Sequence, residues 1–255
     1  MNIRQLIGLG RSMLIYAAPW RQPALRRFYR PLIEPGRPVF DIGAHLGDRS
    51  QAFAALGGRV VALEPQPALR PFLAWRLRRY PDAVVRGDAV GATTGEARLA
   101  LSDRHPTLAS LDADWRASIG DRNPSFADVE WEREVTVPLI TLETLIARYG
   151  LPGFCKIDVE GAEAAVLDGL EQALPALSFE YVAGREDQAR ACLERLASLG
   201  DYRYNVTIGE RRHMALSDWQ TASGMRDWLA EHATAAGSGD VYARLIRRDA
   251  RDRRR

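Results

Sequence analysis

Short apolar runs alternate along the chain with stretches in which apolar residues recur every three or four positions. The runs have the length and composition of strands, and the periodic stretches have the spacing of helices that bury one face. This alternation predicts an α/β fold with a mostly parallel sheet and helices on both faces. We expect a seven-stranded sheet with an antiparallel end. Its strands are predicted at 39–42, 60–63, 83–88, 154–159, 176–181, 202–207 and 241–246, and its helices at 45–56, 67–79, 142–149, 162–174 and 186–199.

A few segments depart from this alternation. A short extended pair is predicted at 98–101 and 135–139. The stretches 103–131 and 209–239 are expected to be loop insertions that overhang the carboxyl ends of the strands, where they would hold an acceptor. Four tryptophans there offer flat apolar faces, and two histidines are possible bases, although each residue has an ordinary loop role as its alternative. These residues are Trp115, Trp131, Trp219, Trp228, His105 and His213.

The organisation along the chain is one domain, 34–248, between a basic amphipathic extension, 1–33, and a basic tail, 249–255. The extension carries six arginines, and its longest uncharged run, 12–20, is too short to cross a bilayer. It is expected either to lie on a membrane surface or to pack on the domain as a helix. We expect a cytoplasmic protein. If the extension lies on a membrane, the protein would be peripheral at the inner face of that membrane.

Composition and charge narrow the classes of function. The chain has 255 residues, 46% of them hydrophobic, which is enough for one large core. The net charge of +2 does not indicate a nucleic-acid partner. The only cysteines, Cys155 and Cys192, form neither a disulfide framework nor a paired metal motif. The oligomeric state is left open.

The turn after the first predicted strand, "VFDIGAHLGDRS", indicates the kind of ligand. Its glycines, Gly43 and Gly47, do not form the dinucleotide pattern G-x-G-x-x-G. Two acids, Asp41 and Asp48, flank the turn, and a carboxylate at a helix N-terminus competes with a diphosphate for the same amide groups. The turn therefore favours a ligand without phosphate, or holds no ligand at all.

Glu64 ends the second strand and follows Gly43 by 21 residues, close to the spacing at which a Rossmann carboxylate reaches a ribose. A ligand with a ribose, no phosphate and positive charge is S-adenosylmethionine, whose cationic groups Asp41 could offset. Asp88, at the end of the third strand, is placed to accept a hydrogen bond from an adenine amino group, or is an ordinary turn aspartate.

The segment "FCKIDVEGAEAAVLDGL" is a strand that runs into a helix, and it carries the candidate catalytic residues. Lys156, the only lysine in the chain, and Asp158 lie on the face opposite Cys155 and Ile157. Burying this pair costs several kcal/mol unless the two residues pair or face a cleft, so they pair structurally or form a site. Glu160 is balanced between the same two roles. Glu163 is predicted to cap the next helix, Gly161 to allow the turn, and Glu180 to line the same cleft or pair with an arginine.

These blocks, together with "ALEPQP", "GDAVGATTGEARL" and "VPLITLETLI", resemble the FkbM-type methyltransferases over residues 39–181. The resemblance implies the Rossmann-like class I methyltransferase fold, S-adenosylmethionine as cofactor, and O-methylation of sugars, glycans, glycolipids or secondary metabolites. Asp41, Gly43, Gly47 and Glu64 match the cofactor motifs of the family. Lys156, Asp158, Glu160 and Glu163 match its signature segment, while His45 stands where asparagine is frequent.

The sequence therefore predicts an O-methyltransferase with a small-molecule or glycan hydroxyl acceptor. Asp158 is the first candidate for the base, Lys156 holds it ionised, and Glu160 is the second candidate. No metal is expected. The predicted cofactor contacts are Asp41, Ile42, Gly43, Ala44, His45, Gly47, Glu64, Pro65, Asp88 and Ala89. The alternatives are a nucleic-acid methyltransferase, which the arginine-rich termini would favour, and an inactive cofactor-binding module.

Overall fold

The structure is a computed structural model that describes residues 20–102, 108–232 and 237–246. The roles predicted for residues 1–19, for His105 and for the tail 249–255 fall outside these described residues.

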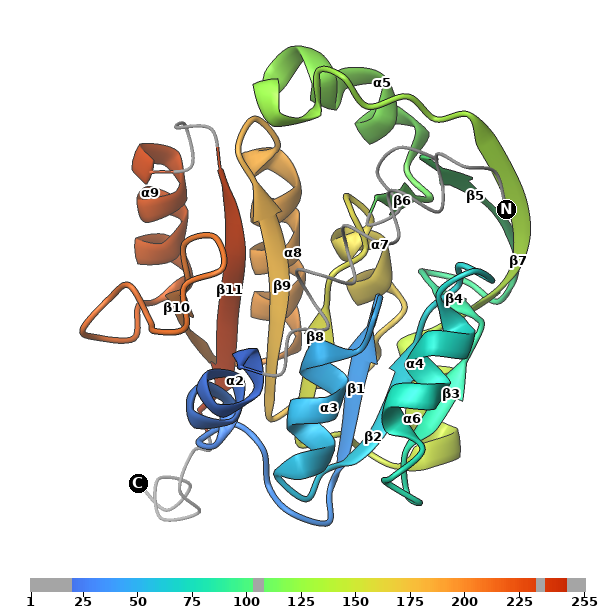
Figure 1. The fold of residues 1–255 in the computed structure, drawn as a ribbon. Coiled ribbons are helices and arrows are strands. Elements are labelled where there is room, and N and C mark those ends of the chain that lie inside the picture. The colour runs from blue at the N-terminus through green and yellow to red at the C-terminus, as the bar shows by residue number, and fades with distance from the viewer. Residues whose placement is uncertain (1–19, 103–107, 233–236, 247–255) are drawn as a thin grey trace, which may run out of the picture.

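A seven-stranded sheet forms the centre of the molecule (Figure 1), in the order β10-β11-β9-β8-β1-β2-β3. All neighbours are parallel except β11, which runs antiparallel to both β9 and β10. The order reverses between β8 and β1, and this confirms the predicted Rossmann-like class I methyltransferase fold. The strands are β1 Pro38–Ile42, β2 Arg59–Leu63, β3 Val84–Arg86, β8 Phe154–Ile157, β9 Ala176–Val182, β10 Tyr202–Val206 and β11 Ser238–Leu245.

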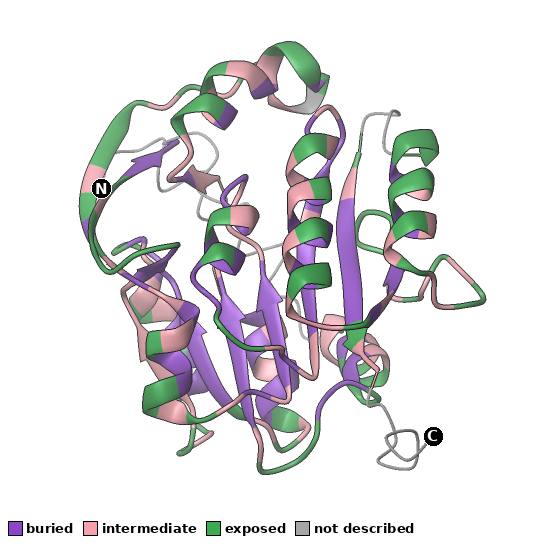
Figure 2. Cartoon of the chain, turned by 180° about the vertical axis from the view of Figure 1, so that it is seen from behind, coloured by how far each residue is buried: buried purple, intermediate pink, exposed green. Residues whose placement is uncertain are grey.

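Helices cover both faces of this sheet, as predicted. Apolar side chains of one helix group pack with Val39, Val60 and Phe154, and those of the other group pack with Phe40 and Cys155, because successive strand residues face opposite sides. Figure 2 shows the buried sheet between helices that expose their outer sides. The first group is α2 Arg21–Tyr29, α3 Asp48–Ala55 and α4 Arg70–Leu77, and the second is α6 Leu142–Tyr149, α7 Glu163–Asp168, α8 Glu186–Leu199 and α9 Ala222–His232.

A second, four-stranded sheet lies beside the first and has the order β4-β7-β5-β6. Its members are β4 Ala89–Val90, β5 Gly95–Leu101, β6 Ala109–Ser110 and β7 Arg133–Ile140. Strands β5 and β7 are antiparallel, which confirms the extended pair predicted at 98–101 and 135–139. Buried apolar side chains of this sheet form a small separate cluster, while Val90 and Ile140 belong to the large core cluster. The separate cluster contains Ala89, Leu99, Leu101 and Val137.

The predicted loop 103–131 is in part a helix, so this prediction is wrong. Helix α5, Ala113–Arg122, is capped by Asp112, whose carboxylate accepts a hydrogen bond from the Trp115 backbone N–H at 2.8 Å. Trp115 and Ile119 are buried four residues apart on one face of the helix. A short 3-10 helix, Pro124–Phe126, follows.

The predicted loop 209–239 is wrong in the same way, because it contains α9. Met225 and Leu229 are buried on one side of this helix and join the large core cluster that also contains α8. In the described part of this stretch, residues 209–221 before α9 are irregular, apart from a single bridge between Gln220 and Tyr204.

Residues 20–33, which the sequence pattern assigns to an extension, pack on the domain instead. Leu25, Tyr29, Leu32 and Ile33 are all buried. The Tyr29 ring meets the Phe53 ring of α3 edge-on, with centroids 4.7 Å apart. The alternative of a helix packed on the domain is therefore correct for this part of the segment. Among the described residues, no helix combines the length and apolar character needed to cross a bilayer.

Candidate active site

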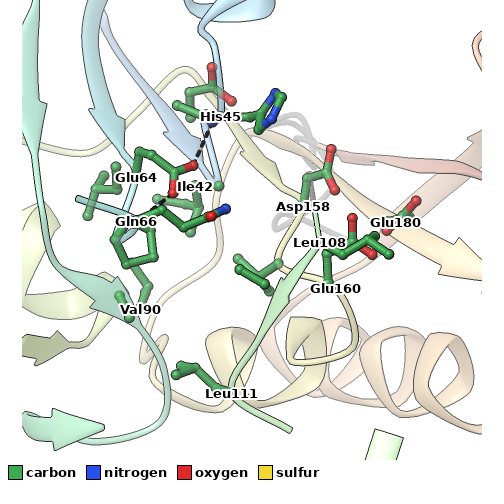
Figure 3. A pocket seen from close by; sticks show the side chains of 18 of the residues that line it. Ile42, His45, Glu64, Gln66, Val90, Leu108, Leu111, Asp158, Glu160 and Glu180 are labelled. Atoms are coloured by element: carbon green, nitrogen blue, oxygen red, sulfur yellow. Dashed lines mark hydrogen bonds between the residues drawn. The ribbon is translucent and has the colours of Figure 1, made fainter. Parts of the chain in front are cut away.

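A cavity of about 350 Å³ lies at the carboxyl ends of β1, β2 and β8, next to the point where the strand order reverses. The residues that follow these strands supply most of its polar wall. It is lined by every predicted cofactor contact except Gly47, and by the predicted catalytic residues Asp158 and Glu160. Figure 3 shows the Glu64 carboxylate on one side, and Asp158, Glu160 and Glu180 together on the other.

Gly43 lets the ends of β1 and β8 meet. A Cβ atom at this position would lie 1.7 Å from the backbone oxygen of Asp158, and the residue has a φ of +80°. The adjacent Asp158 N–H donates a hydrogen bond of 3.0 Å to the Ile42 carbonyl. The glycine is thus required by the contact between two strand ends rather than by a phosphate.

Gly47 has a structural role that its place in the turn does not reveal. It precedes α3 with a φ of +73°, and a Cβ atom there would lie 2.4 Å from a methyl carbon of Leu73 in α4. It does not line the cavity, so its predicted contact with the cofactor finds no support in the geometry.

Glu64 is buried and held by two backbone donors. Its carboxylate accepts hydrogen bonds of 2.8 Å from the N–H groups of His45 and Gln66, drawn as dashed lines in Figure 3. Burial raises its pKa to about 7, although both hydrogen bonds act in the opposite direction. A carboxylate fixed in this way at the end of β2 has oxygen lone pairs left for the hydroxyl groups of a ribose.

Asp41 lies on the adjacent strand and is also buried. The Ser50 hydroxyl donates a hydrogen bond to its carboxylate. Burial raises the pKa of Asp41 to about 6, and the nearby Lys156 charge opposes this shift. Burial lowers the pKa of His45 to about 4, so its imidazole is neutral near pH 7. His45 therefore brings no positive charge to the cavity.

The second sheet closes the cavity with an apolar wall. Asp88 also lines the cavity, but its carboxylate already pairs with Arg86 at 2.8 Å. An adenine amino group at this position would have to share the carboxylate with Arg86. Of the apolar residues in this wall, only Ala89 is among the predicted cofactor contacts, because the wall residues lie in or next to β4, β5 and β6 and the sequence pattern predicts only the pair of β5 and β7 in this sheet. The wall consists of Ala89, Val90, Leu99, Leu108, Ala109 and Leu111.

These residues fit S-adenosylmethionine and disfavour a dinucleotide. A held carboxylate suits a ribose, the apolar wall suits an adenine ring, and buried acids suit a cationic group. At the start of α3, where a diphosphate would bind, the buried Asp48 pairs with Arg21 at 3.3 Å. The predicted preference for a ligand without phosphate agrees with this geometry.

Lys156 is buried behind the cavity and forms an ion pair with Asp158, which lines it. The lysine side chain is 1% exposed and its Nζ lies 2.6 Å from Asp158 and 3.5 Å from Asp240. Burial acts to raise the pKa of Asp158, but the charges of Lys156 and Arg49 prevail and lower it. Asp158 is therefore ionised near pH 7 and faces the cavity, as predicted, whereas Lys156 does not line it.

Asp158, Glu160 and Glu180 bring carboxylate oxygens within 4.8 Å of one another. Burial raises the pKa values of Glu160 and Glu180 well above normal, and a neighbouring charge adds to this effect: Asp158 acts on Glu160, and Glu160 acts on Glu180. A raised pKa favours the protonated form, in which a carboxyl group can donate a hydrogen bond. The spacing would admit a cation, but acidic groups are common at such spacing without one, and we assign no metal to them.

Glu163 and Gly161 shape the turn that presents these acids. The Glu163 carboxylate accepts hydrogen bonds from the N–H groups of Val159 at 2.9 Å and Gly161 at 3.1 Å, which lie in the turn before α7 and not in the helix that Glu163 is predicted to cap. Gly161 has a φ of +100°, and a Cβ atom there would lie 2.4 Å from the Trp115 ring. The turn is thus clamped between α7 and α5.

Glu210, which the sequence does not single out, closes one edge of the cavity. It pairs with Arg21 of α2 at 2.9 Å and with Arg49 of α3 at 3.1 Å. These positive charges lower its pKa to about 2, against the effect of burial. Nothing in the local sequence identifies this residue, because its two partners lie more than 150 positions away.

The predicted role of the tryptophans in an acceptor pocket does not agree with the structure, because none of the four lines the cavity. Trp115 is fully buried and meets Phe126 and Trp131 edge-on. Trp219 lies under the Arg244 guanidinium, and Trp228 packs on Tyr181 and His232. His213 is exposed and is also absent from the cavity wall.

Comparison with known proteins places this site in context. A family model described as the methyltransferase FkbM domain matches residues 41–234. No curated protein gives a significant match. The chain is similar in fold to an O-methyltransferase from Bacillus cereus in complex with SAH, with 12% identity, 96% of this chain and 92% of that chain covered, and a TM-score of 0.45. A putative RNA methyltransferase from Pyrococcus horikoshii has 12% identity, coverage of 88% and 81%, and a TM-score of 0.42.

Proposed function

Because the chain belongs to the FkbM methyltransferase family, we propose that it transfers a methyl group from S-adenosylmethionine to a hydroxyl group of a sugar, glycan, glycolipid or secondary metabolite. Dependence on S-adenosylmethionine follows from the family. The hydroxyl acceptor and the residues that act on it are the proposal.

The observation that carries the proposal is the ionised Asp158 at the cavity. A hydroxyl group is a weak nucleophile, and a carboxylate within hydrogen-bond reach can orient it and accept its proton as the new bond forms. Lys156 holds one oxygen of Asp158 at 2.6 Å from behind. The side chain of Asp158 is 27% exposed, so its carboxylate is open to an acceptor in the cavity.

The cofactor supplies an electrophilic methyl group when it is bound. Glu64 would hold its ribose, the apolar wall of the second sheet its adenine, and Asp41 its positive charge. In the protonated form that their raised pKa values favour, Glu160 and Glu180 would donate hydrogen bonds to further oxygens of a polyhydroxylated acceptor. The arrangement serves a displacement in which the main task is alignment of the reacting groups.

The charge of the cavity favours a neutral acceptor over a nucleic acid. Among the described residues that line it, only Arg49 is cationic, because His45 is neutral near pH 7. A phosphate backbone needs several positive contacts, and carboxylates repel it. The carboxyl groups of the lining are Asp41, Asp48, Glu64, Asp88, Asp158, Glu160, Glu180 and Glu210.

The test is methyl transfer from labelled S-adenosylmethionine to three acceptor pools, namely a glycan extract, a metabolite extract and total RNA. We expect label in a hydroxyl-bearing carbohydrate or metabolite, and loss of at least about 10²-fold in rate with Asp158→Asn. Asp201→Asn is the matched control, because Asp201 is also ion-paired, with Arg203 at 2.6 Å, but lies away from the cavity.

Two results would refute the proposal. Label in RNA alone, with a rate that falls steeply with salt, would identify a nucleic-acid methyltransferase. Tight binding of S-adenosylhomocysteine with no label in any pool would identify an inactive cofactor-binding module.

A further inference from the structure

A row of polar residues crosses one face of the central sheet behind the cavity. In the strand register, Asp41 of β1 lies opposite Lys156 of β8, Lys156 opposite Ser178 of β9, and Ser178 opposite Tyr242 of β11. Residues opposite each other on neighbouring strands face the same side of the sheet. The four side chains therefore form one row on the face that α2 and α3 cover.

A second row follows one step closer to the cavity. Asp158, Glu180 and Asp240 each lie two residues from a member of the first row, and Glu180 is opposite Asp240 in the register. Because side chains alternate along a strand, these three face the same side as the first row. The only lysine of the chain thus lies among several carboxylates.

Lys156 reaches across β9 to contact Asp240. Strands β8 and β11 are separated by β9, so they lie about 10 Å apart. Even so, Nζ of Lys156 lies 3.5 Å from Asp240. Ser178 stands between the two in the register, is fully buried, and its hydroxyl has no hydrogen-bond partner among the described residues. Its small side chain leaves the space through which the lysine extends.

Asp240 is itself fixed. Its second carboxylate oxygen accepts a hydrogen bond of 3.5 Å from the Tyr242 hydroxyl, which lies 3.4 Å from the hydroxyl of Tyr29 in α2. Its backbone carbonyl accepts a hydrogen bond of 2.9 Å from Thr207. A carboxylate with so little freedom is suited to hold its partner in one position.

We propose that Asp240 is a positioning residue for methyl transfer: it shares the Lys156 ammonium group with Asp158, so that the lysine fixes the Asp158 carboxylate without satisfying its whole charge. This inference rests on the proposed role of Asp158. An ammonium group that is divided between two carboxylates leaves more negative charge on each than a one-to-one pair does. Asp158 is thereby both held in place and kept able to accept a proton.

The charges around Lys156 determine the sign of the expected effect. The groups that face it are Asp158 and Asp240, Asp41 in the neighbouring strand, Arg49 of α3 and Tyr29 of α2. Loss of the Asp240 charge removes one of the groups that stabilise the protonated lysine. The ammonium group of Asp240→Asn should therefore lose its proton at lower pH than that of the unmodified chain.

The experiment uses the full chain labelled with ¹⁵Nζ-lysine, which gives one side-chain signal because Lys156 is the only lysine. In Asp240→Asn we expect the ammonium signal to titrate at lower pH and its protons to exchange with water at least about tenfold faster. Ser178→Val, which fills the space that the lysine crosses, should change the signal in the same direction. Asp201→Asn should leave it unchanged. The rate of methyl transfer should fall in both site variants while S-adenosylhomocysteine binds as before.

An ammonium signal that is identical in Asp240→Asn and the unmodified chain would refute the inference. So would a changed signal with an unchanged rate, since the contact would then have no part in the reaction. Absence of methyl transfer by the unmodified chain would instead refute the proposed function, and the two failures are therefore distinguishable.

Discussion

Replacement of Gly43 by alanine tests whether the contact between two strand ends at this residue forms the cavity. The added Cβ atom would lie 1.7 Å from the Asp158 carbonyl oxygen, about half of a normal contact. The obstacle is backbone, which cannot rotate away as a side chain can. The ends of β1 and β8 must therefore separate, and the hydrogen bond from Asp158 to Ile42 must lengthen or break.

Two effects lower the free energy of unfolding of Gly43→Ala. A non-glycine residue at a φ of +80° costs about 1–2 kcal/mol, and overpacking adds about 1–3 kcal/mol. We therefore expect Gly43→Ala to lower the free energy of unfolding by about 2–5 kcal/mol and to weaken S-adenosylhomocysteine binding at least about tenfold. Urea unfolding and isothermal titration calorimetry measure the two effects.

Gly36 provides the matched control, because its φ is +79° and no atom lies within 4 Å of its potential Cβ. Gly36→Ala has the unfavourable φ but no close contact. It should therefore lower the free energy of unfolding by about 1–2 kcal/mol and leave ligand binding unchanged. If both alanine variants lose the same stability and bind the ligand equally well, the close approach at Gly43 is not what forms the site.

Four further predictions follow from the structure. Glu64→Ala should weaken S-adenosylmethionine binding by about 1–3 kcal/mol in calorimetry, and NAD should not bind to the unmodified chain; equal affinity for NAD would contradict this. Asp158→Asn should keep S-adenosylhomocysteine affinity within about tenfold while turnover falls by about 10² or more, and full turnover would make Asp158 structural. Removal of residues 1–19 should spare cofactor binding and abolish any liposome flotation. Removal of residues 1–33 should also lower the unfolding midpoint, because it deletes the buried Leu25 and Tyr29. Burial raises the pKa of Glu64 from 4.5 to about 7, so its contribution to stability is present below about pH 4.5 and is lost as the pH rises through about 7. The free energy of unfolding in urea should therefore decline less over this pH range in Glu64→Gln than in the unmodified chain. An equal decline in the two proteins would exclude Glu64 as its cause.

The parts of the site that could be predicted from sequence depend on local signals. Glu64 and Asp158 each follow a short apolar strand directly, and carboxyl ends of parallel strands meet at one edge of the sheet. Glu163 could be placed in the first turn of a helix, although its hydrogen bonds reach back to the preceding turn. In these cases a few neighbouring residues determine the conformation, so the sequence pattern is sufficient.

The two helices that the sequence pattern misses had weaker signals of the same kind. Thr221 caps the start of α9, where its hydroxyl accepts a hydrogen bond from the Gly224 N–H at 3.2 Å, and Met225 and Leu229 follow with helical spacing. Asp112 precedes α5 in the same way. Both helices contain glycine and several polar residues, and each buries only two apolar side chains, so tertiary packing decides their formation.

Asp240 and Ser178 could not be predicted from the sequence for a different reason. Their significance depends on the register of β11 against β9, and a shift of one residue would turn Asp240 to the opposite face and place Val241 toward Lys156. Hydrophobic alternation indicates that a strand exists but does not state which residue of a distant strand lies beside it. The same holds for Glu210, whose partners belong to α2 and α3. Lys156 shows how the two levels combine. Its burial in a central strand marks it as unusual from sequence alone, but only the assembled sheet shows that its ammonium group lies beside two carboxylates, one of them on a strand near the other end of the chain.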